Sequence, residues 1–343
     1  MSIDFRSDNT HAACPEVLDA LLGAAKGTVT SYGKDPFTAA VRERCSAVFE
    51  TDVAVFPVLT GTAGNALGIA AMTPPWGAVF CHEDAHIQRA ELGAVEFFTG
   101  GAKLIPIAGS EGKLRPDGLA RSIEEIANSH RTAVPACLSL TNATEAGTVY
   151  SVDETRALCD VARARAVRVH VDGARFANAV VSAACAPADL SWRAGVDILT
   201  LGGTKNGAMA AEVIVVFRTE LAAELALRYH RSGHRLSKMR FLSAQLDAYL
   251  ANDVWLRTAR HTNAMASLLA AGISGRVEIL RPVDANIVFA RFPRALAAAL
   301  SAGGFLFSDW PIFGPDAYRL VTGFSTTAAD VDAFVNAVAT SSE

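Results

Sequence analysis

Short apolar runs alternate with helical segments between residues 54 and 217, and this alternation constrains the fold more than any other feature. Runs with the length of buried strands occupy residues 54–59, 78–81, 103–107, 136–141, 167–171, 198–201 and 211–217. Helical patterns lie between most of them, as at residues 115–128 and 152–166. Strands that alternate with helices are typical of βαβ units. The sequence therefore predicts an open α/β sheet.

The alternation is lost from about Asp247 onward. Helical patterns near residues 251–272 and 294–303 and a closing helix at 327–340 surround short strand patterns at 277–280, 287–291 and 318–322. Mixed elements of this kind predict a small α+β domain. We expect three parts: residues 1–30, a segment that packs on the active site and the small domain; residues 31–246, a large domain; and residues 247–343, a small C-terminal domain.

Composition excludes several classes of protein. The chain has 343 residues, of which 51% are hydrophobic, so a disordered or fibrous protein is excluded. Its net charge is −4 and its 31 Lys and Arg residues are scattered, so we expect no nucleic-acid face and no polybasic membrane anchor. The six cysteines never form CxxC and no apolar run approaches a membrane span of about 18 residues. These features predict a cytoplasmic protein with free thiols whose partners are small molecules and copies of itself.

Lys205 is the first candidate for chemistry. It lies in the stretch Asp197-Ile-Leu-Thr-Leu-Gly-Gly-Thr-Lys-Asn206, where two glycines end an apolar run. A solvated loop lysine is the simpler interpretation of such a motif. A second strand end, with Asp172 and Arg175, can face the same crevice, however, and a lysine needs such neighbours to act as a Schiff-base nucleophile. Arg175 is a candidate to meet the Asp172 carboxylate, and a ligand is another.

Residues 60–65 form a candidate anion site. They follow the first predicted strand and precede an alanine-rich helix, so the backbone N–H groups of Gly61, Thr62 and Ala63 are expected to be free at a helix N-terminus. A bare structural turn is the alternative.

Arg319 lies on a predicted strand of alternating character, and its spacing alone indicates an exposed strand residue.

The segment His82-Glu-Asp-Ala-His86 matches H-E-x-x-H, the pattern of zinc proteases. The zinc interpretation requires both histidines on one helix that runs through the motif. Here His82 falls at a strand exit and Asp84 is a natural helix N-cap, so we expect the helix to begin only at Ala85. Zinc hydrolysis through His82 and His86 is a remote alternative, and we expect no metal.

Residues 228–240 carry a run of cations on a predicted long helix. A solvated helix face is the simpler interpretation, and contact with a phosphate or with a neighbouring subunit's site is the functional one. Residues 7–9 and 31–36 are polar loops that can lie across a crevice.

Polar chemistry thus gathers at five strand ends: Gly61 and Thr62, His86, residues 142–145, Asp172 and Arg175, and Lys205. An open α/β sheet binds its ligand outside the carboxyl ends of its strands. Pyridoxal phosphate requires an imine-forming lysine, a carboxylate at its pyridinium nitrogen, a phosphate site and a group flat against its ring. The sequence offers all four. NAD fits worse, because no G-x-G-x-x-G follows the first strand, and a P-loop is absent too.

These residues resemble the L-threonine aldolase, or β-eliminating lyase, family of fold-type I pyridoxal-phosphate enzymes. The segments that carry the resemblance stand in the right order between about residues 4 and 325: Ser7-Asp-Asn, Tyr32-Gly-Lys-Asp-Pro36, Gly61-Thr62 with Asn65, Ala85-His-Ile with Glu91, Gly112-Lys-Leu, Glu145-Ala-Gly-Thr-Val-Tyr150, His170 to Asn178, Gly202 to Gly207 and Ser237 to Phe241. The segment Gly202 to Gly207 is similar to the bacterial low-specificity branch, of which some members prefer phenylserine. The resemblance implies a large domain with a mostly parallel mixed sheet between helices, plus a small C-terminal α+β domain.

The resemblance also implies roles for individual residues, which share one site. Lys205 would hold the cofactor covalently and Asp172 would pair with its pyridinium nitrogen. Gly61 and Thr62 would bind the phosphate, and His86 would stack on the ring. Arg175 would lie near the phenolic oxygen and the substrate, and Tyr32 would contact the substrate. Ser7 and Arg319 would bind the substrate carboxylate, and Lys238 would reach the phosphate of the partner subunit. The site would then lie at the interface of a homodimer, within a dimer or a tetramer.

The expected reaction is retro-aldol cleavage of L-β-hydroxy-α-amino acids, such as L-threonine, L-allo-threonine or L-phenylserine, to glycine and an aldehyde. A β-eliminating lyase acting on a related amino acid is the alternative. Many family members carry a second histidine after the strand that here ends at Thr141, where the chain has Asn142-Ala-Thr-Glu145 instead. His86, a bound water or a neighbouring polar group can each be the base for the β-hydroxyl.

Overall fold

A seven-stranded sheet forms the centre of the protein, which we describe from a computed structural model for residues 2–129 and 131–340. The strand order is β2-β8-β7-β6-β5-β3-β4, and only β8 runs against the others. Their bounds are Ala54–Val58 (β2), Gly77–His82 (β3), Lys103–Ile107 (β4), Val134–Thr141 (β5), Arg168–Gly173 (β6), Ile198–Gly202 (β7) and Glu212–Val216 (β8). The predicted mostly parallel mixed sheet is therefore confirmed.

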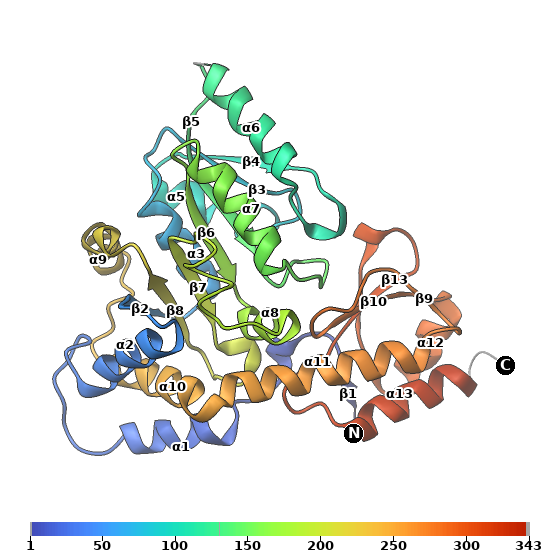
Figure 1. Ribbon diagram of the computed structural model, residues 1–343. Coiled ribbons are helices and arrows are strands. Elements are labelled where there is room, and N and C mark those ends of the chain that lie inside the picture. The colour runs from blue at the N-terminus through green and yellow to red at the C-terminus, as the bar shows by residue number, and fades with distance from the viewer. Residues whose placement is uncertain (1, 130, 341–343) are drawn as a thin grey trace.

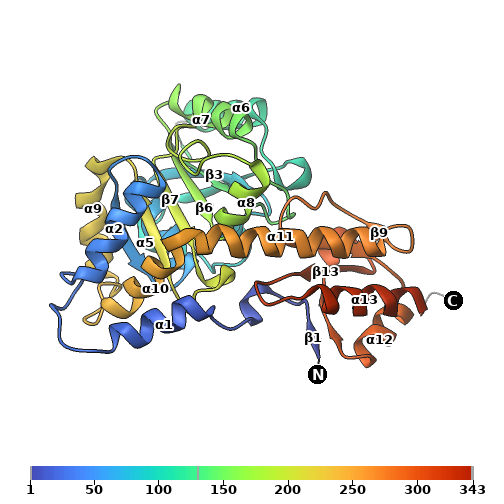
Figure 2. The ribbon, with the colours of Figure 1, turned by 60° about the horizontal axis from the view of Figure 1, so that its bottom comes forward.

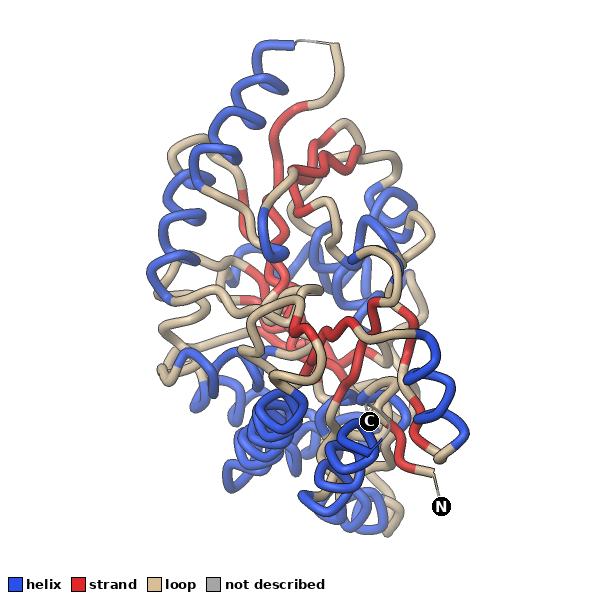
Figure 3. Tube along the Cα trace, turned by 90° about the vertical axis from the view of Figure 1, so that its right-hand side faces the viewer, coloured by secondary structure: helices blue, strands red, loops and turns tan. Residues whose placement is uncertain are grey.

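Helices cover both faces of this sheet (Figure 3). One face carries α3 (Gly61–Ala70), α5 (Ala94–Thr99) and α9 (Ala222–Arg231), and the other carries α6 (Pro116–Ser129), α7 (Val152–Arg163) and α8 (Phe176–Ala183) (Figure 1). Because helices shield both faces, strands β3, β7 and β8 are buried along their whole length. Ser151 begins α7 with the predicted capping box to Glu154.

A second, smaller sheet lies at the other end of the molecule. Its order is β12-β13-β10-β9, all antiparallel, and a separate parallel pair joins β1 to β11. The strand bounds are Ile3–Asp4 (β1), Glu278–Ile279 (β9), Ile287–Arg291 (β10), Phe305–Leu306 (β11), Ser308–Asp309 (β12) and Ala317–Val321 (β13). Two helices of this part of the chain are Arg294–Ala302 (α12) and Ala328–Thr340 (α13). The N-terminal residues thus pair with the C-terminal part of the chain.

The helix α11 (Val254–Ile273) connects the two ends (Figure 2). It packs against α8 beside the large sheet and against α13 beside the small one. Before it, α10 (Arg240–Leu250) packs against α1 (Pro15–Ala24) and α2 (Pro36–Val48). The domain boundary expected at 246/247 falls inside α10, and the three-part division stays a prediction. The remaining short helices are α4 (His86–Arg89) and 3₁₀ turns at Asp8–Thr10, Ser110–Gly112, Thr204–Asn206, Thr219–Leu221, Ala251–Asp253 and Pro311–Phe313.

Two local expectations are wrong. The cationic run at residues 228–240 is not one helix, because α9 ends at Arg231 and α10 begins at Arg240. Gly233 lies between them with φ of 81°, a left-handed conformation that interrupts a helix. Asp84 is not the cap of α4, whose N-cap is Ala85, and it pairs with Arg89 instead. No helix within the described residues is long and apolar enough to cross a bilayer.

Gly64 sets the distance between α3 and the large sheet, because a Cβ atom there would lie 2.5 Å from Cγ2 of Thr200 on β7. We expect Gly64→Ala to lower the free energy of unfolding by about 1–3 kcal/mol through overpacking. Urea unfolding followed by circular dichroism measures this change.

Gly23 in α1 provides the matched control. It is exposed, and an added Cβ would meet no atom within 4 Å. The variant Gly23→Ala should raise stability by about 0.5–1 kcal/mol, since alanine is the better helix former. Equal stability changes in the two variants would contradict the packing argument.

Candidate functional site

A cavity of about 230 Å³ lies at the carboxyl ends of β6 and β7, beside the N-terminus of α3. It is lined by Asn9, Leu59, Thr60, Gly61, Thr62, Asn65, His86, Glu145, Asp172, Ala174, Thr204, Lys205 and Glu212. Five of the residues predicted to share one site, namely Gly61, Thr62, His86, Asp172 and Lys205, therefore do line one cavity. This is the edge at which an open α/β sheet binds its ligand.

Lys205 is positioned by tight packing on both sides. A Cβ atom on Gly202 would lie 2.5 Å from the carbonyl oxygen of Ala174, and one on Gly203 would lie 2.6 Å from that of Ala211. The two glycines are thus needed for close backbone approach as well as for the end of the strand. Asn206, the next residue, is buried and donates to Tyr249 Oη and to the Trp255 carbonyl.

Asp172 ends β6 as a buried carboxylate, and two donors meet it. The amide Nδ2 of Asn65 lies 2.9 Å from Oδ2, and the backbone N–H of Ala174 donates to Oδ1. Of the two candidates to meet Asp172, a ligand and Arg175, the structure does not show Arg175 in this role. Arg175 binds Asp8 instead, through Nε at 2.8 Å and Nη2 at 3.0 Å.

Asp8 is a residue that the sequence did not single out for a role of its own. It is buried, and besides Arg175 it accepts a hydrogen bond from Asn286 Nδ2. Burial raises the pKa of Asp8, but the charges of Arg175 and Lys205 outweigh this, so that the pKa lies below its usual value. Asp8 thereby joins the N-terminal segment, α8 and the small sheet at one point.

A chain of hydrogen bonds links Asp172 to His86. Asn65 Nδ2 also donates to Glu91 Oε1 at 2.9 Å, and the same oxygen lies 2.8 Å from His86 Nδ1. Glu91 has a fully buried side chain, and burial raises its pKa. The hydrogen bond to Glu91 raises the pKa of His86. Asn65 and Glu91 were part of the resemblance, but nothing in their spacing predicted this chain.

Glu212 is a further buried acid that sequence reasoning missed, because it begins an apolar strand. Its Oε2 accepts a hydrogen bond from the backbone N–H of Gly203, two residues before Lys205. Burial raises the pKa of Glu212 to about 7. A carboxyl group beside Lys205 can therefore gain or lose its proton near neutral pH.

The N-terminus of α3 has two free donors, not the three expected. Ala63 N–H is taken by the Thr60 hydroxyl at 3.1 Å, which caps the helix. The N–H groups of Gly61 and Thr62 have no acceptor within the residues that the structure describes. They face the cavity at the positive end of the helix dipole and can hold an anion.

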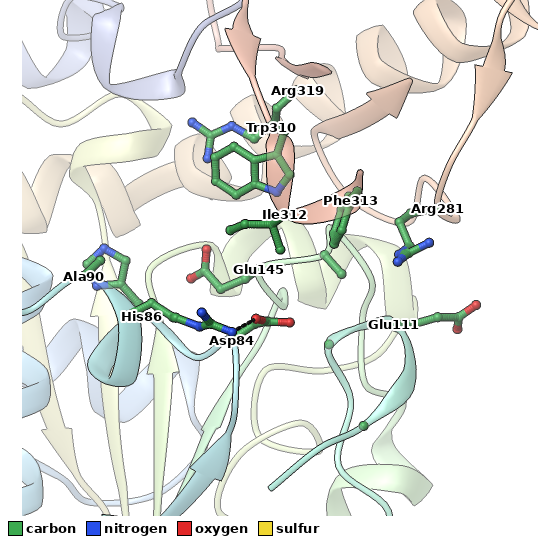
Figure 4. A pocket seen from close by; sticks show the side chains of 14 residues that line it. Asp84, His86, Ala90, Glu111, Glu145, Arg281, Trp310, Ile312, Phe313 and Arg319 are labelled. Carbon is green, nitrogen blue, oxygen red and sulfur yellow. Dashed lines mark hydrogen bonds and ion pairs between the residues drawn. The ribbon is translucent and has the colours of Figure 1, made fainter. Parts of the chain in front are cut away.

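A second cavity, of about 300 Å³, adjoins the first (Figure 4). The two share His86 and Glu145, and the second is lined by segments that follow β3, β4 and β5 and by residues of the C-terminal part of the chain: Asp84, His86, Arg89, Ala90, Gly109, Glu111, Gly112, Glu145, Ala146, Arg281, Trp310, Ile312, Phe313 and Arg319. Arg319 lies over the Trp310 ring at 4.4 Å, and its Nη2 donates to the Arg6 carbonyl. Its Nε is buried without an acceptor in the described part of the chain.

Four predicted site residues do not line either cavity: Ser7, Tyr32, Arg175 and Lys238. The hydroxyl of Ser7 accepts a hydrogen bond from Asn9 N–H and caps the 3₁₀ turn that carries Asp8. Tyr32 and Lys238 are exposed on another surface, where Tyr32 N–H donates to the Ser237 carbonyl. Within one chain, therefore, neither Tyr32 nor Lys238 contributes to the two cavities.

The geometry for zinc catalysis is not present at His82 and His86. His82 is the last residue of β3 and His86 the first of α4, so no single helix carries both. The His82 ring contacts Gly109 O and Asp84 N, and His86 Nδ1 is bound to Glu91. No group of three or more potential metal ligands occurs among residues 2–129 and 131–340.

Comparisons with known proteins agree on one family. The family described as Beta-eliminating lyase matches residues 4–294. The chain is 40% identical to the low specificity L-threonine aldolase of Pseudomonas aeruginosa, over 94% of this chain and 93% of that one. Leishmania major threonine aldolase has a TM-score of 0.93 at 24% identity over 99% of both chains, and Sphingomonas wittichii serine palmitoyltransferase has one of 0.75 at 12% identity over 99% and 87%. The fold is that of fold-type I pyridoxal-phosphate enzymes.

The Asp8–Arg175 pair makes stability depend on one buried carboxylate. We expect Asp8→Asn to lower the free energy of unfolding by about 3–5 kcal/mol, because it leaves the buried Arg175 charge uncompensated. The pKa of Asp8 is lower in the folded protein, so its contribution is present above the ordinary value of about 3.9 and lost as the pH falls through the lowered value. Urea unfolding across the acid range measures both effects.

Asp160→Asn is the control for this prediction. Asp160 pairs with Arg163 on the surface of α7, and both side chains are more than half exposed. Its loss should change stability by less than about 0.5 kcal/mol. If Asp8→Asn were no more destabilising than Asp160→Asn, the buried pair would not support the fold.

Proposed function

The chain belongs to the β-eliminating lyase family, and from this premise we propose that it cleaves L-β-hydroxy-α-amino acids to glycine and an aldehyde. L-threonine and L-allo-threonine are the proposed substrates, and L-phenylserine is a further one. The activity would be that of a carbon–carbon lyase that uses pyridoxal phosphate. The identity with a low specificity L-threonine aldolase over nearly the whole chain supports this assignment.

The first cavity fits pyridoxal phosphate. Lys205 would hold the cofactor through its amine, Asp172 would bind the pyridinium nitrogen, and the N–H groups of Gly61 and Thr62 would bind the phosphate. The observation in favour is that Gly61, Thr62, Lys205 and the buried Asp172 line one cavity. When bound, pyridoxal phosphate supplies an electron sink for the pair left on Cα.

His86 and Asp172 would hold the cofactor ring in place. The two side chains are connected through Asn65 and Glu91, so neither turns without breaking a buried hydrogen bond. His86 would lie flat against the ring, and Asp172 would keep the ring nitrogen protonated. Arg175, held by Asp8, would lie near the phenolic oxygen and the substrate.

Arg319 is the proposed partner of the substrate carboxylate. It forms no ion pair within the described residues, and burial lowers its pKa, although a guanidinium stays charged at any ordinary pH. The Asp8 carboxylate already occupies Arg175, which leaves Arg319 as the freer cation. Ser7, next to the Arg6 carbonyl that binds Arg319, would add a hydroxyl.

One observation carries the proposal: the cavity lined by Lys205 and Asp172 adjoins the cavity lined by Arg319, and the two share His86 and Glu145. An α-amino acid can therefore place its amine near Lys205 and its carboxylate near Arg319, with Cβ at the junction. Orientation of this kind sets which bond at Cα breaks, so a clamp on the carboxylate favours cleavage of Cα–Cβ.

The assay is direct. We expect purified protein with pyridoxal phosphate to form equimolar glycine and aldehyde from L-threonine and from L-threo-phenylserine. Lys205→Ala should lose both the bound chromophore and turnover, because no other amine lines the cavity. Lys103→Ala, an exposed lysine on β4, is the control and should keep both.

Two results would contradict this function. Pyruvate and ammonia from serine or cysteine, with no glycine from threonine, would identify the β-eliminating reaction instead. Cleavage by Lys205→Ala at the wild-type rate would remove the role of the lysine altogether.

We further propose that two copies complete each site. Lys238 and Tyr32 neighbour one another on an exposed surface away from both cavities, where Arg235 lies over the Tyr32 ring at 5.9 Å. Leu18 and Leu22 of α1 are exposed to 45% and 67%, as suits a face that pairs with a second copy. A partner that brings Lys238 to the phosphate would account for its place outside both cavities of its own chain.

Complementation between two inactive variants tests this arrangement. If Lys238 acts in the partner's site, coexpressed Lys205→Ala and Lys238→Ala chains should form mixed dimers in which one site is intact. Random pairing would then restore about a quarter of the wild-type sites. Activity per bound cofactor in the mixture, compared with each variant alone, is the measurement. Absence of any gain would place Lys238 in its own site or outside the mechanism.

A further inference from the structure

The proposed reaction requires a group that removes the β-hydroxyl proton, and the present inference rests on that function. In the proposed arrangement, a substrate held between Lys205 and Arg319 would place its β-carbon where the two cavities meet. Among the described residues, only His86 and Glu145 line both cavities. The base is therefore to be sought in these two side chains.

Glu145 lies on a loop whose backbone is held firmly. Thr144 Oγ1 accepts from the N–H groups of Ala146 and Thr148 and shares a hydrogen bond of 2.7 Å with Thr148 Oγ1. Asn142 exchanges two further bonds with the backbone of Tyr150. A carboxylate on such a loop keeps its place when substrate binds, as catalysis demands.

The Glu145 carboxylate itself is free. It forms no hydrogen bond or ion pair with any described residue, and Figure 4 shows it pointing into the space between His86 and Ile312. Its charge acts on His86, Arg175 and Arg319, which places it beside both the proposed ring partner and the proposed carboxylate clamp.

The other acids near the junction are engaged or remote. Asp84 is paired with Arg89, and Glu91 is buried against Asn65 and His86. Glu212 binds the Gly203 N–H and does not line the second cavity. Glu111 is exposed and lines the second cavity only (Figure 4).

His86 is the weaker candidate. Its Nδ1 is bound to Glu91, and this bond raises the pKa of His86, so that a larger fraction of the ring is protonated near neutral pH. A protonated imidazole cannot accept the proton of an alcohol. It can, however, stabilise a neighbouring carboxylate as an anion.

We propose that Glu145 is the general base that takes the proton of the substrate β-hydroxyl. The electron pair of the O–H bond forms the C=O bond of the aldehyde while the Cα–Cβ bond breaks. The electron pair of the Cα–Cβ bond stays on Cα, where pyridoxal phosphate, when bound, would act as the electron sink. One proton is transferred to Glu145, and one proton then adds to Cα to give glycine. Glu145 returns its proton to solvent once the aldehyde has left.

The test separates this step from the rest of the chemistry. Glu145→Gln should lower kcat for cleavage of L-threonine by about 10²–10⁴-fold, the usual contribution of a general base. Exchange of the glycine α-proton with deuterated solvent involves no β-hydroxyl and should stay within about twofold of wild type. The dissociation constant of glycine, titrated by cofactor absorbance, should likewise be unchanged.

Glu111→Gln is the matched control, since it removes a carboxylate from the same cavity and lies outside the proposed machinery. It should leave all three measurements unchanged. Glu145→Ala provides a second variant: added formate should restore part of its threonine cleavage without affecting glycine exchange, because a small carboxylate can occupy the vacated space. A purely structural role for Glu145 would give no such rescue.

Other outcomes overturn the assignment. Threonine cleavage by Glu145→Gln at close to the wild-type rate would exclude Glu145 as the base. Parallel loss of cleavage, glycine exchange and glycine binding would show that Glu145 maintains the site and does not transfer this proton. If wild-type protein exchanged the glycine proton but released no aldehyde from threonine or phenylserine, the proposed function itself would fail.

Discussion

The amide of Asn65 holds the site together, because its single Nδ2 donates to both Asp172 and Glu91. Without it, two buried carboxylates would each lose one of their hydrogen-bond partners, at considerable cost. Asn65 can reach both only because α3 lies directly against the sheet. Gly64 permits this close approach to Thr200, and Gly68, one turn later, faces Ile198 and His170. The close packing of α3 on the sheet therefore has two effects: it places the N-terminus of α3, which can bind an anion, and it brings Asn65 to the two carboxylates.

The sequence predicted the large sheet and the edge that carries the cavity, since apolar runs and their polar ends are local patterns. It could not predict the partner of Arg175. Asp8 lies 167 positions away, whereas Asp172 is only three residues distant. The strands β1, β11 and β12 have two residues each, too few for any periodic signal. The occupied Ala63 N–H depends on the rotamer of Thr60, which the sequence does not specify.

Substrate geometry depends on how the two sheets are held relative to each other. Asp172 lies on β6 of the large sheet and Lys205 in the turn after β7, whereas Arg319 lies on β13 of the small sheet and Trp310 directly follows β12. The buried Asp8 carboxylate connects them, because it binds Arg175 on one side and Asn286 on the other. An ion pair between distant segments can specify orientation even where it adds little to stability. The N-terminal residues therefore belong to the site although their pattern is irregular.

Asp172 and Glu212, two acids that line the first cavity, have different surroundings. Asp172 receives donors from Asn65 and Ala174, and so is held ready to meet a cation such as a protonated ring nitrogen. Glu212 lies across from Val58, next to the residues that would bind a phosphate, and burial raises its pKa to about 7. A bound phosphate would raise that pKa further, because neighbouring negative charges favour the protonated carboxyl. Glu212 can thus give up its charge where an anion would bind, whereas the Asp172 carboxylate is already met by two donors.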